Sequence, residues 1–349
     1  MLKKIIVIAF ILISVSGFSN DHDAVLDGGF WQLGPGILGQ FSDEELAREV
    51  SYMNDLGMDI IMIQYSVMPI WQKGQEDYIA YVPNSVYPLH PAFQNRAPFE
   101  SVLDAADKED MQVYIGGMLI RKPFKENYRE YVSNWCSIKA LKFRLELIER
   151  FSAHPSFRGF YCPNEPNPAK LAQNGLDPEV LLRATKRVTS FLKSLKPDLE
   201  IVKAIGLYLE PDGKGGHEYA SREYLDDFWR PFVSGLEDVD VWMVIDGVGT
   251  GLSNIKHTAM SQEWAMNLAH EYGKEYWTDV ENARMGYVNG KYSAEPFPMS
   301  KLEKSLEVAS RFAKRMVTFD YLHYMSRQSQ KEKARALHRD YSRRLEKRR

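Results

Sequence analysis

Cysteine is scarce in this sequence, with only Cys136 and Cys162 among 349 residues. That count excludes the dense disulfide framework that holds many small secreted domains together. The two thiols are able to pair in an oxidising compartment, and the sequence leaves that question open. Cys162 lies inside an apolar run, so we expect it to be a buried small hydrophobic residue.

Excess charge and cofactor motifs are also lacking. The formal net charge of −3 gives no electrostatic reason to expect a nucleic-acid partner. Gly247–Gly251 superficially resembles a dinucleotide loop but lacks the third glycine at the right spacing, and His270 has no second histidine at the zinc spacing. There is no phosphate-binding P-loop and no Gly-x-Ser-x-Gly elbow. We therefore predict no cofactor and no bound metal.

The apolar run at the N-terminus is short for a membrane span, which needs about 20 apolar residues. Ile5–Val15 follows Lys3 and Lys4 and precedes small and polar residues up to Ser19. This order is typical of a secretory signal and predicts cleavage near Ser19, so that residues 1–19 are removed. We expect a periplasmic or secreted protein without stable membrane insertion after cleavage, and a retained anchor is the alternative.

The rest of the chain alternates short β-rich runs with amphipathic helical stretches. Ser42 and Glu45 form a predicted capping box for the first helix, and Asp177 with Pro178 begins another. The predicted strands are 28–33, 59–65, 112–119, 157–163, 200–206, 239–246, 275–280 and 316–321. The predicted helices are 42–56, 98–109, 138–152, 177–195, 221–233, 261–272, 301–314 and 331–345.

Strands that are apolar throughout indicate burial on both faces, and alternation with helices indicates parallel β–α–β units. Eight such units predict a (β/α)₈ barrel, with residues 20–349 as one catalytic domain. An open, doubly wound sheet is the competing architecture. In a barrel of this kind the active site lies on the loops that follow the strands, so the polar residues at strand ends are the candidates.

These strand-end residues form a polar, carboxylate-rich set. They are Gln64, Asn164, Glu165, Asp246, Asp279, Glu281, Asn282 and Asp320. Glu165 follows the fourth strand between Pro163 and Pro166, which stiffen the backbone. Glu281 follows the seventh strand on the opposite wall of the barrel. Two glutamates placed in this way can flank one scissile bond.

The Asn-Glu-Pro at 164–166 and the strand-seven Glu281 resemble the signature of the clan A (4/7) retaining glycoside hydrolases. Within that superfamily the chain is similar to an exported bacterial family of glycosidase-like barrels, of the domain-of-unknown-function type. The likeness extends over nearly the whole mature chain. It also rests on Gly-Phe-Trp-Gln at 29–32, Gln64-Tyr65, Gly-Phe-Tyr at 159–161 and Asp-Gly-Val-Gly at 246–249.

The resemblance implies a double displacement on a poly- or oligosaccharide. Glu165 is then the acid/base, Glu281 the nucleophile, and Asn164 a hydrogen-bond partner of the sugar 2-hydroxyl. An apolar strand at Phe160 and Tyr161 would help to keep Glu165 protonated. The clan usually carries an arginine near the nucleophile and a tyrosine after strand six. Here Gln64 and Asp246 occupy those places.

Aromatic residues offer platforms for sugar rings. The insertion 65–93 carries Tyr65, Trp71, Tyr78, Tyr81, Tyr87 and His90. It predicts either a stacking wall, with Tyr65 and Trp71 as the first candidates, or a loop with its own hydrophobic cluster. Trp31 ends the first strand and is a further candidate, whereas Trp277 is expected in the core.

Several alternatives stay open. Glu165 and Glu281 are each either catalytic or structural strand-end carboxylates. Asp279 shares a strand face with Glu281 and rivals it as the catalytic partner, and Asp246 either binds sugar or caps the following turn. Asn282 is a further predicted sugar contact.

A catalytically silent glycan-binding barrel is the second function, and a lyase or metal-assisted hydrolase using Asp246, Asp279 and Glu281 is the third. The basic C-terminus from Arg327 predicts a solvated helix face.

Overall fold

The computed structural model describes residues 23–72, 75–119, 128–166, 171, 177–207, 221–288 and 291–348, with the backbone alone at residues 71–72, 75–76, 128–131, 287–288 and 291–292. The predicted export signal, residues 1–19, lies outside the described residues, so export stays a prediction.

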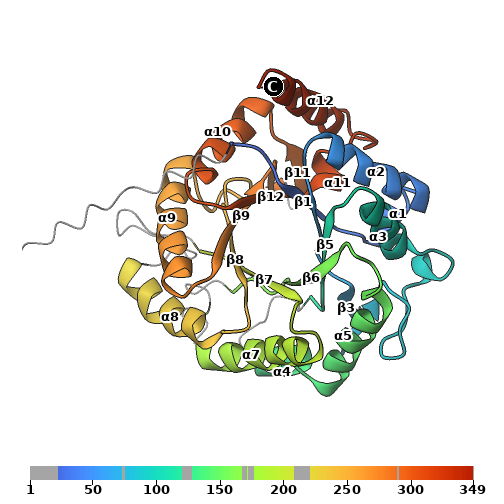
Figure 1. Cartoon of the computed structure of the whole chain (residues 1–349), viewed down its shortest axis with the longest axis vertical. Helices are drawn as coiled ribbons and strands as arrows, with labels where there is room; N and C mark the ends of the chain where they lie inside the picture. The colour runs from blue at the N-terminus through green and yellow to red at the C-terminus, as the bar shows by residue number, and fades with distance from the viewer. Residues whose placement is uncertain are drawn as a thin grey trace, which may run out of the picture.

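Eight parallel strands close into a barrel, as Figure 1 shows from one end. They are β1 (Gly28–Trp31), β2 (Ile60–Ile63), β5 (Gln112–Gly116), β6 (Phe157–Cys162), β7 (Glu200–Ile205), β8 (Val241–Ile245), β9 (Glu275–Glu281) and β12 (Arg315–Phe319). β1 pairs with β2 on one side and with β12 on the other. This closure confirms the (β/α)₈ barrel and excludes the open sheet.

Helices surround the barrel (Figure 1). The longer ones are α2 (Asp43–Asp55), α3 (Pro98–Lys108), α5 (Ile138–Phe151), α7 (Pro178–Leu195), α8 (Arg222–Gly235), α9 (Ile255–Glu271), α10 (Met299–Ala309) and α12 (Glu332–Glu346). Ser42 and Glu45 form the predicted capping box of α2, and Asp177 accepts a hydrogen bond from Glu179 N at the start of α7. The prediction for α9 was late by about two turns, because Asn254 caps the helix before its apolar residues begin.

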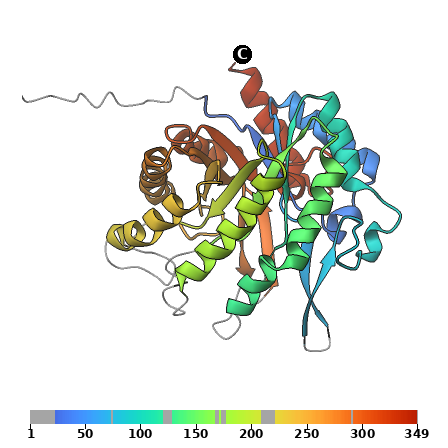
Figure 2. The same ribbon diagram turned by 60° about the horizontal axis from the view of Figure 1, so that its bottom comes forward.

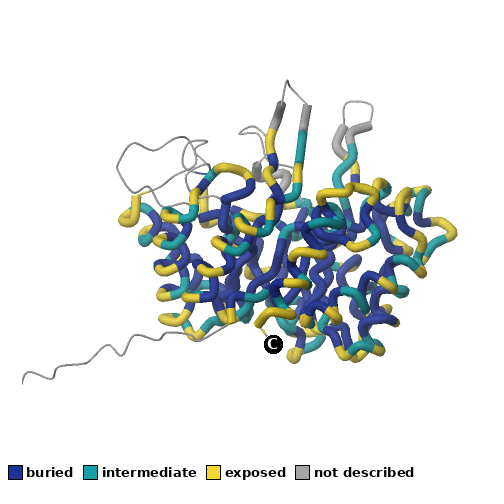
Figure 3. Tube along the Cα trace, turned by 90° about the horizontal axis from the view of Figure 1, so that it is seen from above, coloured by how far each residue is buried: buried dark blue, intermediate teal, exposed yellow. Residues whose placement is uncertain are grey.

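Side chains of the strands separate into two layers. Those that point to the barrel axis form an inner cluster, and those that point outward pack against the helices. The inner cluster includes Phe30, Tyr114, Tyr161 and Trp277, so the expected core position of Trp277 is confirmed. Figure 3 shows that the buried residues run through the middle of the molecule and that most exposed residues lie around its outside.

Two hairpins extend the barrel at one end. β3 (Val67–Gln72) and β4 (Gln75–Ala80) follow β2, and β10 (Ala283–Val288) and β11 (Lys291–Pro296) follow β9. Figures 2 and 3 show both projecting from the same end, which is the end where the barrel strands finish. The short helices α1 (Pro35–Leu38), α4 (Tyr128–Trp135) and α11 (Tyr321–Tyr324), and the 3₁₀ turn Pro91–Phe93, complete the described elements.

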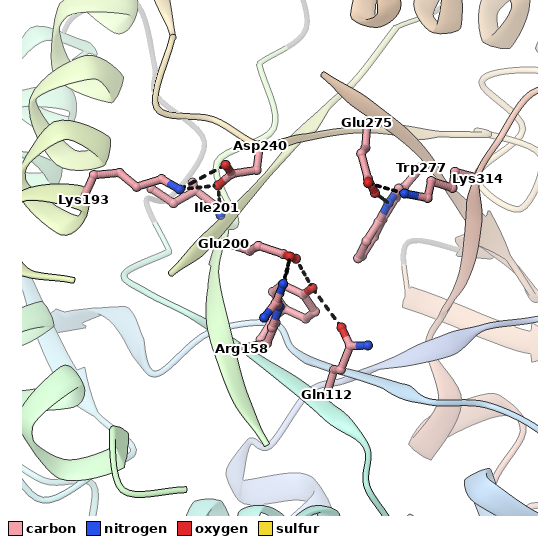
Figure 4. A network of polar contacts seen from close by, with 10 residues as sticks. Gln112, Arg158, Lys193, Glu200, Ile201, Asp240, Glu275, Trp277 and Lys314 are labelled. Atoms are coloured by element: carbon pink, nitrogen blue, oxygen red, sulfur yellow. Dashed lines mark hydrogen bonds and ion pairs between the residues drawn. The ribbon is translucent and has the colours of Figure 1, made fainter. Parts of the chain in front are cut away.

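The opposite end of the barrel, where the strands begin, is closed by polar contacts (Figure 4). Glu200 at the start of β7 accepts hydrogen bonds from Tyr114 and Arg158, and Lys193 pairs with Asp240. Glu275 at the start of β9 contacts Lys314. In (β/α)₈ barrels the active site lies at the other end, and residues at this end serve stability.

Cys136 and Cys162 are free thiols in this structure, and Cys162 is buried as expected. Among the described residues, no helix is both long and apolar enough to cross a membrane.

Candidate active site

Glu281 is the last residue of β9 and lies at the end of the barrel where the strands finish. Side chains alternate along a strand, so Glu281 and Asp279 point the same way as Trp277 in the inner cluster. Only 3% of Glu281 is exposed. The carboxyl of Glu281 therefore points toward the barrel axis and is almost fully shielded from water.

The loop between β8 and α9 holds this carboxyl. Gly249 N and Thr250 N donate hydrogen bonds to Glu281 Oε2 at 2.6 and 3.0 Å, and Thr250 Oγ1 lies 3.4 Å from the same oxygen. We call these two residues the amide cradle. Gly249 is required for this approach, because a Cβ atom there would lie 2.2 Å from the Ala283 carbonyl oxygen and 2.9 Å from Glu281 Cβ.

The amide cradle and burial act on Glu281 in opposite directions. Burial raises its pKa to about 7, the hydrogen bonds from Thr250 and Gly249 oppose that rise, and the charge of Glu165 adds to it. The glycine-rich run that failed as a dinucleotide motif thus serves to position a carboxylate. The sequence analysis did not predict this role for Gly247–Gly251. The spacing of the glycines in that run was the feature of the sequence that could have indicated it.

Asp279 lies two residues below Glu281 on the same face of β9. It is 3% exposed, and within the described part of the chain its Oδ1 atom has no hydrogen-bond partner. Burial raises its pKa well above the usual range, and the neighbouring charges of Glu281, Glu165, Asp246 and Asp320 raise it further. Burial and these neighbouring charges therefore both favour the protonated form of Asp279.

Asp246 follows β8 and is 2% exposed. Its Oδ1 atom accepts a hydrogen bond from Val248 N at 3.0 Å, so it does cap the turn that begins the amide cradle. Its Oδ2 atom has no partner among the described residues. Burial and then the charge of Glu281 raise the pKa of Asp246 well above its usual range.

Glu165 follows β6 and is the most exposed of these carboxyls. Tyr161, from the inner face of β6, donates its hydroxyl to Glu165 Oε1 at 3.0 Å. Asn164 beside it is half-buried. Phe160 faces outward among the helices, so the expectation that it desolvates Glu165 was wrong; alternation along the strand turns it away.

A second polar group lies at the ends of β1 and β2. Gln32 Nε2 donates to Gln64 Oε1 at 2.7 Å, and Gln64 is 9% exposed. Gln32 was not among the predicted site residues, although it ends the Gly-Phe-Trp-Gln segment. Tyr65 is half-buried, packs on Tyr81 and has its pKa raised by burial, by Tyr81 and by the charge of Asp320.

Two predicted sugar contacts are displaced from the site. Trp31 is fully buried and faces outward, where its ring stacks on Tyr321 and its Nε1 atom donates to Met53 Sδ at 3.1 Å. Asn282 is fully buried as well, and its Nδ2 atom donates to the Asp320 carbonyl at 3.2 Å. Neither side chain offers a surface to a ligand, so both predictions are corrected.

The aromatic insertion forms a cluster of its own. Tyr81 stacks on Phe93 with ring centroids 4.7 Å apart, and Tyr78 packs on Tyr87. Tyr78, Tyr81 and Tyr87 are at most 7% exposed, so the hydrophobic-cluster alternative holds for these three. The side chain of Trp71 lies outside the described residues, and its stacking role stays a prediction.

The carboxyls of the site do not converge as metal ligands. Across the described ranges, one group of three potential ligands has its atoms within 4.8 Å of one another, namely Asp104, Asp107 and His154. That group belongs to α3 and to the loop before β6, away from the ends where the strands finish. The arrangement of Asp246, Asp279 and Glu281 therefore gives the metal-assisted alternative no support.

Solved structures with a similar fold include proteins described as glycosidases. A "putative alpha-L-fucosidase" from Bacteroides thetaiotaomicron VPI-5482 superposes with a TM-score of 0.73 at 16% identity, covering 99% of both chains. A beta-galactosidase from the psychrophilic Marinomonas ef1 gives 0.56 at 9% identity, over 91% of this chain and 59% of its own. The endo-beta-1,4-mannanase of Thermotoga petrophila gives 0.51 at 13% identity, over 93% and 77%.

Identities this low establish the shared fold alone. No curated protein matches the sequence. A protein family does match, over residues 26–333, which take in all eight barrel strands. The chain therefore belongs to the family described as "Domain of unknown function (DUF4434)".

Proposed function

We propose that this protein is a retaining glycoside hydrolase with Glu281 as nucleophile and Glu165 as acid/base. The observation that carries the proposal is the fixed carboxyl of Glu281, buried at the barrel axis and held through one oxygen by the amide cradle. The charge of Glu165 acts on it from the end of β6. Similar barrels are described as glycosidases, which agrees with a carbohydrate substrate.

The chemistry follows from these two positions. Glu281 Oε1 attacks the anomeric carbon while Glu165 gives its proton to the departing glycosidic oxygen. Glu165 then takes a proton from water, whose oxygen attacks the same carbon and releases Glu281. Binding of Oε2 by two amides leaves Oε1 as the attacking atom and fixes the direction of attack.

Asp279 was the rival nucleophile, and its environment argues against it. Burial and the neighbouring carboxylates favour its protonated form, which is a poor nucleophile, whereas Glu281 receives two amide hydrogen bonds that favour its ionised form. The neutral form of Asp279 suits a hydrogen bond to a sugar hydroxyl or to a neighbouring carboxylate. We therefore assign Asp279, with Asn164, Gln64 and Asp246, to substrate binding.

The test is a screen of aryl glycosides with α-L-fucosyl, β-galactosyl and β-mannosyl groups, alongside plant and microbial glycans. We expect Glu281→Gln and Glu165→Gln to lower kcat by at least about 10³-fold, as loss of a catalytic group does. Asp279→Asn, which mimics the protonated carboxyl, should retain measurable kcat. Proton NMR of the first product formed should show the retained anomer.

Added azide separates the two glutamates. In Glu281→Gly azide should give a glycosyl azide of inverted configuration, and in Glu165→Gly one of retained configuration. Loss of turnover in Asp279→Asn with activity kept in Glu281→Gln would reverse the assignment. Glycan binding without turnover by the unaltered protein would instead establish the silent glycan-binding barrel.

A further inference from the structure

A fully buried lysine lies directly behind the Glu165 segment. Lys203 is the fourth residue of β7 and is 0% exposed. Val202 and Ala204 on either side of it belong to the inner cluster, so Lys203 points outward, toward the helices. The register of β6 and β7 sets it beside Cys162, three residues before Glu165.

The ammonium group of Lys203 ends on backbone carbonyls. Nζ donates a hydrogen bond to the carbonyl oxygen of Asn164 and a second, of 3.0 Å, to that of Ala204. The first carbonyl belongs to the peptide bond that joins Asn164 to Glu165. Lys203 therefore holds the peptide plane that sets the direction in which Glu165 leaves the chain.

The other side of Glu165 is tied to the same strand. Gly206 N, just past the end of β7, donates to the Pro166 carbonyl oxygen at 3.1 Å. The backbone of Glu165 is thus held before and after by β7, while Tyr161 holds its carboxyl. Two prolines limit the remaining freedom of the segment.

A buried ammonium is costly for stability, because it gives up its hydration. Burial lowers the pKa of Lys203 to about 8, and Cys162 and Glu165 act in the opposite direction. The group is therefore mainly charged at neutral pH. A buried apolar side chain would fill the same space at lower cost, so the charge itself calls for a role.

We propose that Lys203 is a positioning residue for Glu165, which fixes the peptide bond before it and supplies a cation that favours its ionised form. This rests on the proposed function of Glu165. In the first step Glu165 gives up its proton, and between the two steps it is a carboxylate. The fixed ammonium group of Lys203 favours the release of this proton and also the carboxylate form of Glu165, and it does so without contacting the substrate.

The test compares three replacements at one position. Lys203→Met removes both the charge and the hydrogen bond, Lys203→Gln keeps a donor without charge, and Lys203→Arg keeps the charge. Arg144→Met is the matched control. Arg144 is likewise a buried cation, 2% exposed, but its Nη1 atom donates to the backbone carbonyls of Trp135 and Ala140, at 3.0 and 3.1 Å, rather than to that of Asn164.

The first readout needs no substrate. Glutamate labelled with ¹³C at Cδ allows the carboxyl of Glu165 to be titrated by NMR, with its signal identified by its loss in Glu165→Gln. We expect the midpoint to rise by about half a pH unit or more in Lys203→Met and Lys203→Gln, because a neighbouring cation is lost. It should stay near the original value in Lys203→Arg and Arg144→Met.

The second readout is the pH dependence of kcat/KM, whose basic limb reports the general acid. The pH midpoint of that basic limb should rise by the same amount in Lys203→Met and Lys203→Gln. Among the described residues, the titratable groups that act on Lys203 are Cys162 and Glu165, and Arg144 acts on Cys162. Cys162→Ser is therefore run to show that the thiol does not cause the shift.

An unchanged Glu165 midpoint in both neutral variants overturns the proposal, as does an equal shift in Arg144→Met. If Lys203→Met does not fold, Lys203→Gln decides the question. If neither folds, Lys203 is a structural residue and the proposal is wrong. Failure to hydrolyse any glycoside, with the midpoint shifted as expected, would refute the proposed function and leave the role of Lys203 intact.

Discussion

Glu281 combines a nearly complete burial with a negative charge, and this combination makes the stability of the protein depend on pH. Its pKa of about 7 in the folded chain lies above the value of 4.5 for a free glutamate. Between these two values the folded carboxyl keeps a proton that the unfolded chain has lost. The contribution of Glu281 to the free energy of unfolding is therefore fully present below about pH 4.5. It falls as the pH rises to about 7 and does not change further above that pH.

We expect Glu281→Gln to remove much of this dependence, because an amide does not titrate but still accepts from the amide cradle. Between pH 4.5 and 8 the wild-type protein should lose on the order of 3 kcal/mol through Glu281 alone. Urea unfolding at both values measures the difference. Exposed Glu263 on α9 gives the control, Glu263→Gln, and an equal slope in all three proteins would contradict the expectation.

The close approach of the loop between β8 and α9 to Glu281 requires a glycine at position 249. A methyl group at Gly249 would displace either the Ala283 carbonyl or Glu281 itself. We expect Gly249→Ala to lower the free energy of unfolding by about 1–3 kcal/mol, as overpacking does, and to lower kcat more than it changes KM. Unfolding curves and steady-state kinetics measure both effects.

The matched control is Gly286→Ala in β10, where an added Cβ meets nothing within 4 Å. That variant should keep the stability and the kcat of the unaltered protein. A Gly249→Ala variant with normal kcat would show that the amide cradle is not needed to position Glu281.

The whole barrel divides its tasks between its two ends. Asp246 and Asp279, each with one carboxylate oxygen that has no partner among the described residues, lie where the strands finish. The ion pairs of Figure 4 close the end where the strands begin. Tyr114 spans part of this distance, because its ring lies in the inner cluster and its hydroxyl donates to Glu200 Oε2 at 2.5 Å.

Glu200→Ala should therefore lower stability and spare catalysis. Removal of the acceptor weakens the bonding of a buried hydroxyl and breaks the contact with Arg158, for an expected loss of about 1–3 kcal/mol. Thermal or urea unfolding measures the loss, and kcat/KM should stay within about two-fold. Glu149→Ala, at an exposed position on α5, should change neither; a large fall in kcat/KM for Glu200→Ala would contradict the division.

The strands and helices of the barrel were predictable because each is encoded by neighbours in the chain. Continuous apolar runs and capping residues such as Ser42 and Asp177 placed nearly every element within a few residues. The two hairpins were missed, since their mixed sequences carry neither the period of a helix nor a buried strand pattern. In the structure β3 pairs with β4, and β10 with β11, in antiparallel register.

The sequence by itself determined the barrel, and it determined that Glu165 follows the fourth barrel strand and that Asp279 and Glu281 lie at the end of the seventh. Tertiary structure alone decided which strand-end residues face the axis. It turned Trp31 outward and buried Asn282, because a side chain's direction depends on where the strand ends and what packs behind it. It also brought Gly249 to Glu281 and Lys203 to Asn164, contacts across 32 and 39 residues that no local pattern encodes.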